Sequence, residues 1–417
     1  MLPHPTLDAP PPLRGSDAGS FAQYTVETRL PDLLQRTRET ADLPTSARAH
    51  LRALNEELPH AWIRAIDDPN APDREDWDAY VSAVRGQTWA EVPWFFAETY
   101  FYRRILEASG YFGRPCPGVD PFAPQKSAAR SEDARAVDAL AERTVAADGS
   151  AGWDLVAAAL ETALWGNQAD LSMWPGENRP DSGDAPSDDD ILADDRDRLR
   201  SWLDAHAPLA RVDLILDNVG FELAADLALA SALLETGTAD RVLLHAKTHP
   251  TFISDATSSD VYAVVGGLSD DDPGTPHAFA DLLQSYMDAG RLRVTDHLFW
   301  TSPLPGWGLF RSLYDRLAES DLLISKGDAN YRRWLGDRHW EATADLQAIV
   351  DYAPAPLLAM RTLKSEVVAG LDAAAEKRAH DRSESWMTDG TFGVIQFAPD
   401  PAGHPAYRSP AAADEQE

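Results

Sequence analysis

Three side chains with oxygen ligands follow two successive apolar runs of the sequence. Asp217 and Asn218 come directly after the run 212–216 (VDLIL), and Asp255 follows the next run, 242–246 (VLLHA), at the end of a short segment. If both runs are parallel strands, these side chains meet at the carboxyl edge of the sheet, where open α/β sheets bind ligands. Two carboxylates and an amide, without sulfur, suit Mg²⁺ or Mn²⁺. The competing interpretation is that Asp217 and Asn218 only cap the following helix.

Glu222 stands four residues after Asn218, in the first turn of a helix predicted over 220–235. A capping box would place the acidic residue three positions after the cap, so this spacing does not match it. An offset of one turn instead directs Glu222 toward the crevice beside Asp217 and Asn218. The alternative is a first-turn carboxylate that the helix dipole stabilises.

Basic residues follow the predicted strands nearer the C-terminus. The run 321–325 (DLLIS) leads into KGDANYRRW, where Gly327 permits a tight turn and Arg332 can face an anion together with backbone N–H groups. The segment lacks the second glycine and the Gly-Lys-Ser/Thr ending of a P-loop. A simple turn with a charged edge is the alternative interpretation.

Lysine is rare in this chain, and its positions are informative. Of five lysines, Lys247, Lys326 and Lys364 each come after a predicted strand. Arginine supplies all the other basic side chains, so a compact ammonium group is an unusual choice here. We therefore expect positive charge at the carboxyl edge of the sheet.

Short apolar runs separated by helix-length segments predict a doubly wound α/β domain with a mostly parallel sheet in the second half. Apolar residues in the first half recur at spacings of three and four, which predicts helices. The fold class expected is therefore α/β with a helical N-terminal region. The predicted strands cover residues 212–216, 242–246, 292–294, 321–325, 356–360 and 393–397.

Composition divides the chain into five stretches. Residues 1–22 are rich in proline, which fixes φ and removes donors, so a flexible tail is expected. Residues 173–198 are crowded with Pro, Gly, Ser and Asp and predict an exposed acidic loop. The predicted helical domain covers 23–172, the metal-binding α/β domain covers 199–400, and the polar end 401–417 is expected to fray.

The net charge is −31 over 417 residues, which argues against binding to nucleic acid or to an anionic membrane surface. The single cysteine excludes a disulfide framework and a zinc-thiolate cluster. No apolar run is long enough to span a membrane, and the first twenty residues do not read as a signal peptide. A cytoplasmic protein is expected. The sequence leaves the oligomeric state open, and a monomer is the simpler expectation.

Several motifs occur in a fixed order along the chain: Asp217-Asn218 with GFEL, HAKTHPTFISD ending at Asp255, GDANYR from Gly327, and RTLK from Arg361 to Lys364. Together they resemble the metal-dependent damage-control phosphatase family (domain of unknown function 89). RTLK is similar to the third subfamily, of which a member has also been described as an acidic-residue methyltransferase. WAEVPWFFAETYFYRRI, DPFAPQK and LWGNQADLS extend the resemblance into the first half, although GDAN stands where the family has GDLN.

The resemblance implies a helical N-terminal region packed on a three-layer α/β/α sandwich. It implies that Asp217, Asn218 and Asp255 bind a divalent metal, Mn²⁺, Ni²⁺, Co²⁺ or Mg²⁺, with Asp217, Asp255 and Lys364 as the catalytic residues. The implied substrate is a small phosphorylated metabolite, such as fructose 1-phosphate or fructose 6-phosphate. The implied substrate contacts are Glu222, Asp328, Asn330, Tyr331, Arg332 and Lys364.

Three functional hypotheses stay open. The first is hydrolysis of a phosphomonoester, in which Lys364 and Arg332 offset phosphoryl charge and either water or a ligand aspartate attacks. The second is S-adenosylmethionine-dependent methylation of carboxyl groups, although the turn DNVGF lacks the expected Gly-rich loop. The third is a non-catalytic protein that binds a partner through the aromatic residues in 89–102, whose near-continuous spacing is more typical of a core.

Overall fold

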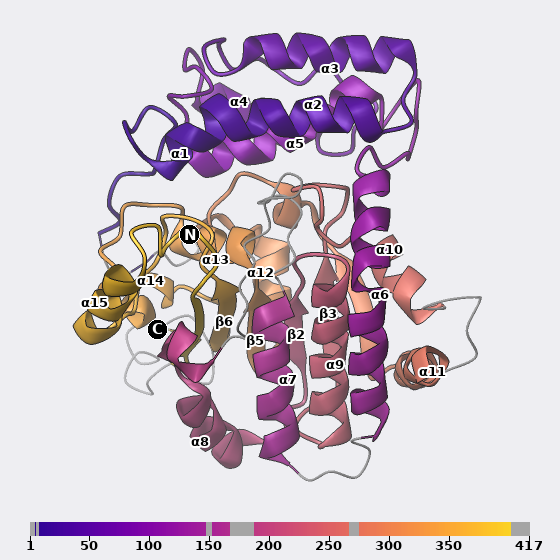
Figure 1. Cartoon of the computed structure of the whole chain (residues 1–417), viewed down its shortest axis with the longest axis vertical. Coiled ribbons are helices and arrows are strands. Elements are labelled where there is room, and N and C mark those ends of the chain that lie inside the picture. The colour runs from indigo at the N-terminus through magenta and orange to yellow at the C-terminus, as the bar shows by residue number, and fades with distance from the viewer. Residues whose placement is uncertain (1–4, 6–7, 147–151, 167–186, 267–274, 402–417) are drawn as a thin grey trace, which may run out of the picture.

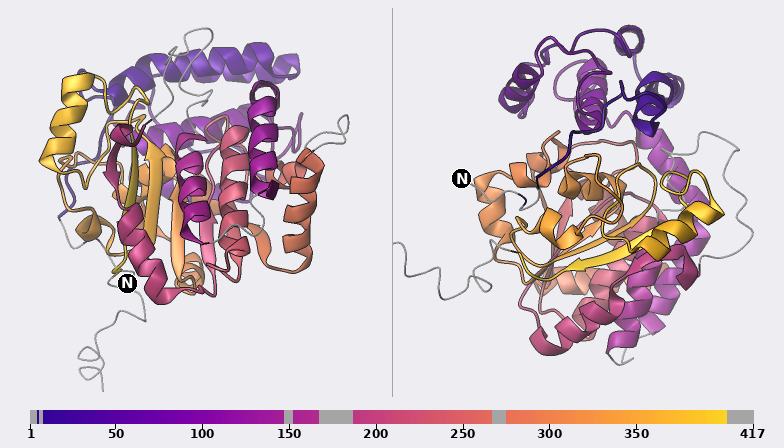
Figure 2. Two further views of the ribbon diagram at one scale, coloured as in Figure 1. Left: turned by 60° about the horizontal axis from the view of Figure 1, so that its bottom comes forward. Right: turned by 90° about the vertical axis from the view of Figure 1, so that its left-hand side faces the viewer.

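The computed structural model describes residues 5, 8–146, 152–166, 187–266 and 275–401. A layer of helices, which we call the helical region, lies across one end of an α/β region (Figures 1 and 2). The helical region consists of α1 (Phe21–Tyr24), η1 (Thr25–Arg29), α2 (Leu30–Thr40), α3 (Thr45–Glu57), α4 (Arg74–Ala83) and α5 (Trp94–Ser109).

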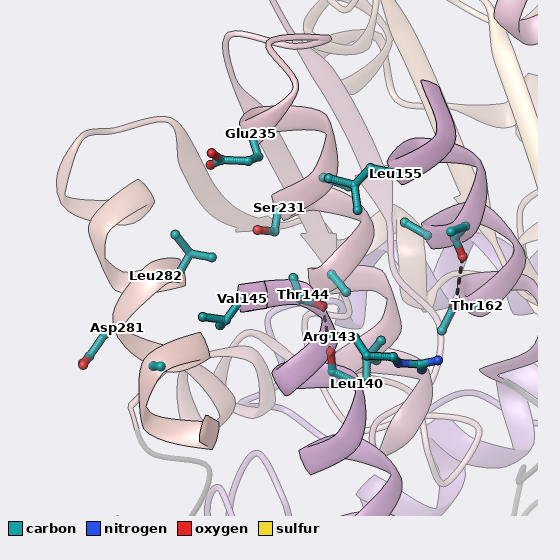
Figure 3. Close-up of a pocket in the computed structure, with 15 residues that line it drawn as sticks. Leu140, Arg143, Thr144, Val145, Leu155, Thr162, Ser231, Glu235, Asp281 and Leu282 are labelled. Carbon is teal, nitrogen blue, oxygen red and sulfur yellow. Dashed lines mark hydrogen bonds between the residues drawn. The ribbon is translucent and has the colours of Figure 1, made fainter. Parts of the chain in front are cut away.

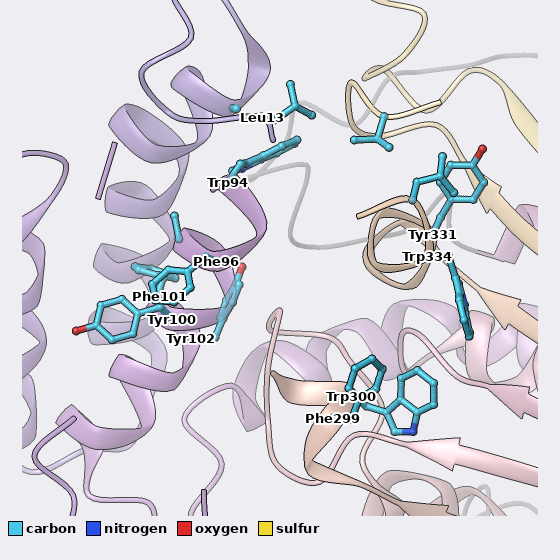
Figure 4. Packing of buried hydrophobic residues seen from close by; sticks show 14 of the residues in the cluster. Leu13, Trp94, Phe96, Tyr100, Phe101, Tyr102, Phe299, Trp300, Tyr331 and Trp334 are labelled. Atoms are coloured by element: carbon cyan, nitrogen blue, oxygen red, sulfur yellow. The ribbon is translucent and has the colours of Figure 1, made fainter. Parts of the chain in front are cut away.

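Helix α5 is buried along nearly its whole length. Pro93 precedes its first residue, and Gly110 ends it at φ +79°, a left-handed conformation that favours glycine. The prediction that its aromatic side chains form a core, and not an exposed binding face, is confirmed, and Figure 4 shows most of them. The buried aromatic residues of α5 are Trp94, Phe95, Phe96, Tyr100, Phe101 and Tyr102.

Residues 8–20 do not form the flexible tail that the proline content predicted. Pro12 and Arg14 form isolated bridges with Arg338 and Pro93, and Leu13 is buried in the main hydrophobic cluster. Proline is compatible with this because an extended segment bonded at a few points needs few of its own N–H groups. The structure corrects the prediction for this segment, which joins the helical region to the α/β region.

Seven strands of the described ranges form one sheet in the order β1-β7-β6-β5-β2-β3-β4. Neighbouring strands are parallel except β6 and β7, which are antiparallel. The predicted α/β class, with a mostly parallel sheet and a helical N-terminal region, is confirmed. The strands are β1 (Ile191–Asp194), β2 (Val212–Ile215), β3 (Val242–Ala246), β4 (Leu292–Asp296), β5 (Leu322–Lys326), β6 (Leu357–Thr362) and β7 (Gly393–Ala398).

Strand β1 lies inside the stretch 173–198, which composition predicted to be a loop. Ile191 and Leu192 are buried where β1 pairs with β7, and helix α8 (Arg196–His206) follows at once. A four-residue edge strand carries only three consecutive apolar residues, so its pattern does not stand out from the acidic residues around it. The remaining residues of that stretch, 173–186, lie outside the described part of the chain, as does 402–417 of the predicted polar tail.

Side chains of the central strands alternate between two hydrophobic clusters on opposite faces of the sheet. Leu214 and Leu216 belong to one cluster and Ile215 belongs to the other, as the two-residue period of a strand requires. The first cluster contains α7 (Trp153–Trp165) and α9 (Phe221–Glu235), which cover the sheet in Figure 1. The second contains α12 (Arg311–Leu317), α14 (Leu346–Val350) and the helical region. The sheet is therefore the middle of three layers.

Helices α6 (Ala123–Ala146) and α7 belong to the α/β region, although composition placed them in the helical domain 23–172. Helix α6 packs along α9 and α11 (Thr275–Asp288), and α7 packs along α9 and β6. Composition misses this boundary because both sides of it are helical. The other helices are α10 (Ser258–Val265), α13 (Asp328–Leu335) and α15 (Ala373–Arg382). Within the described ranges, no helix is both long and apolar enough to cross a bilayer.

Candidate functional site

A pocket at the carboxyl ends of β2, β5 and β6, here called the edge pocket, collects six of the nine predicted site residues. The carboxyl ends of parallel strands bring together loops from distant parts of the chain, which explains the convergence. The helical region also contributes to its wall. The lining residues are Arg29, Trp94, Glu98, Asp217, Asn218, Phe252, Asp255, Asp328, Ala329, Arg332 and Lys364.

Backbone hydrogen bonds hold the three predicted metal ligands side by side. Asn218 and Asp255 form an isolated antiparallel bridge. The carbonyl of Asp217 accepts from the N–H of Ala256 over 2.7 Å, and the N–H of Val219 donates to the carbonyl of residue 254 over 2.7 Å. The segment after β3 is thus fixed against the turn after β2, and Asp255 comes beside the Asp217-Asn218 pair.

The side chain of Asn218 is oriented by three neighbours. Its Nδ2 donates to Oδ2 of Asp217 and to Oε2 of Glu222, each over 2.9 Å. Its Oδ1 accepts from Oγ of Ser254 over 2.7 Å. Because an amide oxygen has two lone pairs, this orientation leaves Oδ1 able to bind a cation as well.

Gly327 lets the backbone after β5 approach Asp217 closely. Its φ is +83°, and a β-carbon at this position would lie 1.9 Å from Oδ2 of Asp217. No side chain fits there, and the left-handed conformation independently favours glycine. Gly327 therefore leaves the space that the Asp217 carboxylate occupies.

The side chains of the edge pocket fit a hard divalent cation. Asp217, Asn218 and Asp255 can supply oxygen ligands, and among the described residues neither Cys nor His lines the pocket. Among the described residues, no three His, Cys, Asp or Glu side chains form a metal-binding group, so the Asn218 amide would have to complete the set. In the described part of the chain, four carboxylates line the pocket with only three cationic side chains, and a divalent cation would offset that excess.

Glu222 lies behind Asn218 and does not line the edge pocket. Its Oε1 accepts from Nζ of Lys326 over 3.2 Å, while Oδ1 of Asp226 lies 2.9 Å from the same ammonium group. All three side chains are at most 2% exposed. Burial raises the pKa of Asp226 to about 7, with Glu222 adding to the shift and Lys326 opposing it. Glu222 is therefore placed to orient Asn218, and it is not among the described residues that line the edge pocket.

Lys247 supports Asp255 from inside the protein. Its Nζ lies 3.1 Å from Oδ2 of Asp255 and donates to Oδ1 of Asn330 over 3.2 Å. The Nδ2 of Asn330 donates to the carbonyls of Leu216 and Lys326, over 3.0 and 2.8 Å. Asn330 thus ties the ends of β2 and β5 together, and the structure does not place it in the pocket as a substrate contact.

Tyr331 also lies away from the edge pocket. Its hydroxyl donates to Oε1 of Gln396 over 2.8 Å and accepts from the N–H of Ala369 over 3.3 Å, and the side chain is buried. Adjacent residues of a helix point in different directions, so GDANYR cannot direct every polar side chain to one ligand. Among the residues of that motif, Asp328 and Arg332 reach the pocket and Asn330 and Tyr331 support the fold.

Asp328 and Lys364 line the pocket from the ends of β5 and β6. Oδ1 of Asp328 accepts from Nη1 of Arg361 over 2.5 Å and from Oγ of Ser365 over 2.7 Å. Arg361, of the RTLK motif, thus fixes Asp328, while Lys364, only 3% exposed, reaches the pocket. A buried ammonium group beside carboxylates is suited to hold a phosphoryl group.

Arg332 is held by contacts that come mainly from the helical region. Its Nη1 donates to Oε2 of Glu98, its Nε donates to Oδ1 of Asp337 over 2.7 Å, and its guanidinium lies 3.6 Å from the ring centre of Trp94. Burial lowers the pKa of Arg332, but Asp337 and Glu98 outweigh burial and raise the pKa above its ordinary value. The guanidinium group of Arg332 therefore keeps its positive charge.

Sequence reasoning missed the contribution of Arg29, Trp94 and Glu98. The available signal was Glu98 itself, a carboxylate inside the aromatic run WFFAETYFYRR, where a buried acid needs a cationic partner. The partners, Arg29 and Arg332, are far away in sequence. The structure alone shows that the helical region completes the pocket.

A larger cavity of about 580 Å³ lies between α6, α7, α9 and α11, away from these residues (Figure 3). Its lining is mainly apolar and includes Leu140, Leu155 and Leu282, with Arg143 and Glu235 among the few charged side chains. The described residues that line it do not form a convergent ligand set for a metal or a phosphate. Although this cavity is larger than the edge pocket, the edge pocket is the better candidate for the active site.

Comparison with known proteins places the chain in a family. Residues 25–379 match the model of the Damage-control phosphatase ARMT1-like domain. The chain is 33% identical to Damage-control phosphatase ARMT1 of Danio rerio, over 95% of this chain and 98% of that protein. It is 30% identical to the proteins of that name from Mus musculus, over 94% and 99%, and Homo sapiens, over 93% and 98%.

A solved structure of a DUF89 family protein from Pyrococcus horikoshii is similar over 90% of this chain and 98% of that one, with 17% identity and a TM-score of 0.49. The sequence matches alone decide the family. Fold and site define an α/β protein whose sheet edge carries oxygen ligands and buried cations. The chain belongs to the damage-control phosphatase ARMT1-like family.

Proposed function

We propose that the protein is a metal-dependent phosphatase that hydrolyses phosphomonoesters of small sugars, of the fructose 1-phosphate or fructose 6-phosphate type. The observation that carries the proposal is the edge pocket, where Asp217, Asn218 and Asp255 lie with Arg332 and Lys364. Oxygen ligands for a cation and fixed positive groups for an anion are the two parts that phosphoryl transfer requires. The relatives named Damage-control phosphatase ARMT1 support the same class of reaction.

The side chains have distinct roles in this proposal. Asp217, Asn218 and Asp255 would hold Mn²⁺, Ni²⁺, Co²⁺ or Mg²⁺, which supplies Lewis acidity toward phosphoryl oxygens and orients water. Lys364 and Arg332 offset the charge that spreads over the phosphoryl oxygens in the transition state. Both cations are 3% exposed, and poor solvation strengthens their interaction with an anion.

Attack by water is the route that we propose. Asp217 and Asp255 are both tied to neighbours on the protein side, Asp217 to the Asn218 amide and Asp255 to Lys247. Such contacts suit fixed ligands better than a nucleophile that has to move toward phosphorus. A covalent phospho-aspartate is the alternative, and acid-quench trapping of labelled protein distinguishes the two routes.

A carboxyl methyltransferase is less compatible with the site. The edge pocket is lined by seven charged side chains, whereas an adenosine group needs an apolar cleft and a close backbone approach. The turn after β2 has the sequence DNVGF, and its first two residues are the candidate metal ligands Asp217 and Asn218. It therefore lacks the glycine-rich loop that an adenosine group would need. Phosphate is therefore the better ligand for this pocket.

The deciding experiment is a panel of sugar phosphates and nucleotides assayed with Mg²⁺, Mn²⁺, Co²⁺ and Ni²⁺. We expect metal-dependent release of phosphate from small sugar phosphates, loss of that activity in Asp255→Asn, and a fall in kcat of about 100-fold or more in Lys364→Met. Metal-independent methyl transfer from S-adenosylmethionine, without phosphate release, would contradict the proposal.

A further inference from the structure

Arg332 lines the edge pocket, and three neighbours hold its guanidinium group. Glu98 binds Nη1, Asp337 binds Nε, and the Trp94 ring covers one face. Nη2 is buried and has no hydrogen-bond partner among the described residues. The side chain is 3% exposed, so the protein must leave this N–H group for a ligand or lose a buried hydrogen bond.

Two of these contacts come from one turn of α5. Trp94 begins the helix and Glu98 lies four residues later, so their side chains share a face. Asp337 is fixed to the same helix, because its Oδ2 accepts from the N–H of Phe95 over 2.8 Å. The orientation of Arg332 thus depends on the position of α5, which is outside the α/β region; Trp94 heads that helix in Figure 4.

Glu98 is an unexpected side chain for an anion site. It is 1% exposed, lines the pocket and adds negative charge where a phosphate would bind. Its two oxygens receive two arginines, Arg29 over 3.4 Å and Arg332. A carboxylate at the pocket wall repels a bound phosphate. By fixing the direction of two guanidinium groups, it can nevertheless strengthen phosphate binding more than this repulsion weakens it.

We propose that Glu98 is a positioning residue for phosphate binding, because it holds Arg332 with Nη2 directed at the phosphoryl group. The phosphate site is then assembled from both regions, and it is complete only while α5 lies against α13. This inference rests on the proposed phosphatase function. It goes beyond that function in assigning part of the phosphate affinity to the helical region, through Arg332, while the candidate metal ligands lie in the α/β region alone.

The test compares Glu98→Gln with Glu107→Gln in the metal-loaded protein. Glu107 is a matched control, since it lies on the same helix, is 9% exposed and also binds two arginines, Arg64 and Arg104, but lies outside the edge pocket. Calorimetry measures the affinities for inorganic phosphate and Mn²⁺, kinetics give KM and kcat for a sugar phosphate, and thermal unfolding gives stability.

We expect Glu98→Gln to weaken phosphate binding and raise KM by about tenfold or more, since it misdirects a charge-assisted contact. Its Mn²⁺ affinity should change by less than about twofold, and Glu107→Gln should lose stability while keeping phosphate affinity. Unchanged phosphate affinity in Glu98→Gln, or an equal loss in Glu107→Gln, would overturn the inference.

Two further outcomes keep the hypotheses apart. If the metal-loaded wild-type protein neither binds phosphate nor releases it from sugar phosphates, both the proposed function and this inference are wrong. If Glu98→Gln does not fold, Glu98→Asp retains the charge on a shorter side chain. A positioning role still requires weaker phosphate binding in Glu98→Asp, and wild-type affinity there would contradict it.

Discussion

Gly327 and Asp217 approach each other so closely that a β-carbon on residue 327 would lie 1.9 Å from the Asp217 carboxylate oxygen Oδ2. Gly327→Ala therefore has to displace the first candidate metal ligand. It also imposes φ +83° on alanine, which by itself costs about 1–2 kcal/mol. We expect lower thermal stability and a fall in Mn²⁺ affinity, measured by calorimetry.

Gly237→Ala is the control for that experiment. Gly237 has φ +66°, but nothing lies within 4 Å of the place its β-carbon would take. It should lose a similar amount of stability from backbone strain while keeping the Mn²⁺ affinity of the wild type. Equal loss of metal affinity in both variants would show that the Asp217 contact does not matter.

Glu222→Gln tests whether this residue orients Asn218 or binds substrate. The amide keeps an acceptor but can turn its N–H₂ toward Asn218, and it weakens the contact with Lys326. We expect the Kd for Mn²⁺ to rise about 10- to 100-fold, which is typical for the loss of a residue that orients a metal ligand. Glu235→Gln, at the far end of α9 and bonded to Tyr286, should leave metal binding unchanged. A rise in KM without weaker Mn²⁺ binding would restore the substrate-contact role that the motif implied.

Asp73 should make the stability of the protein sensitive to acid. Burial alone would raise the pKa of Asp73, but contacts from His249 and Arg103 outweigh burial and lower it well below its ordinary value. A carboxyl with a lowered pKa in the folded state contributes stability above the unfolded pKa of about 3.9 and loses it as pH falls further. Asp73→Asn should thus cost on the order of 3 kcal/mol at pH 7.

The pH profile separates this effect from general acid unfolding. The difference in unfolding free energy between wild type and Asp73→Asn should stay constant from about pH 7 to pH 5 and shrink below about pH 4. The control is Asp78→Asn, since Asp78 is an exposed carboxylate on α4, the helix that begins directly after Asp73. A difference that does not change with pH would exclude the charge of Asp73 as the cause.

Salt should affect substrate binding only weakly. The net charge of −31 would repel the proposed sugar phosphate substrate at long range, so its binding would depend on buried cations such as Arg332 and Lys364. Ions screen exposed charges far more than buried ones. We expect KM to change by less than about threefold between about 0.05 and 0.5 M NaCl. A steep rise of KM with salt would indicate that exposed charges carry the binding.

Much of the sheet could be predicted from the sequence because local patterns encode it. The run Val212 to Leu216 is apolar enough for a strand buried on both faces, and Asp217-Asn218 directly after it marks a carboxyl end. Strand β1 was not predicted, because three apolar residues in an acidic stretch are too short a pattern to indicate a strand. The ordered structure of the segment around Leu13 was not predicted, because the residues that it contacts are distant in sequence. These are Pro93, Asp337 and Arg338.

The sequence by itself determined which residues end the strands, and with them the candidate ligands Asp217, Asn218 and Asp255. Only the tertiary structure decided which motif residues line the pocket: Glu222 bonds to Asn218, and Asn330 bonds to Lys247, which also contacts Asp255. It also decided that Glu98, from a helix whose pattern indicated only a core, holds Arg332. The physical reason is that strand ends follow from local hydrophobic patterns, whereas the partner of a buried charge is set by contacts between residues far apart in the chain.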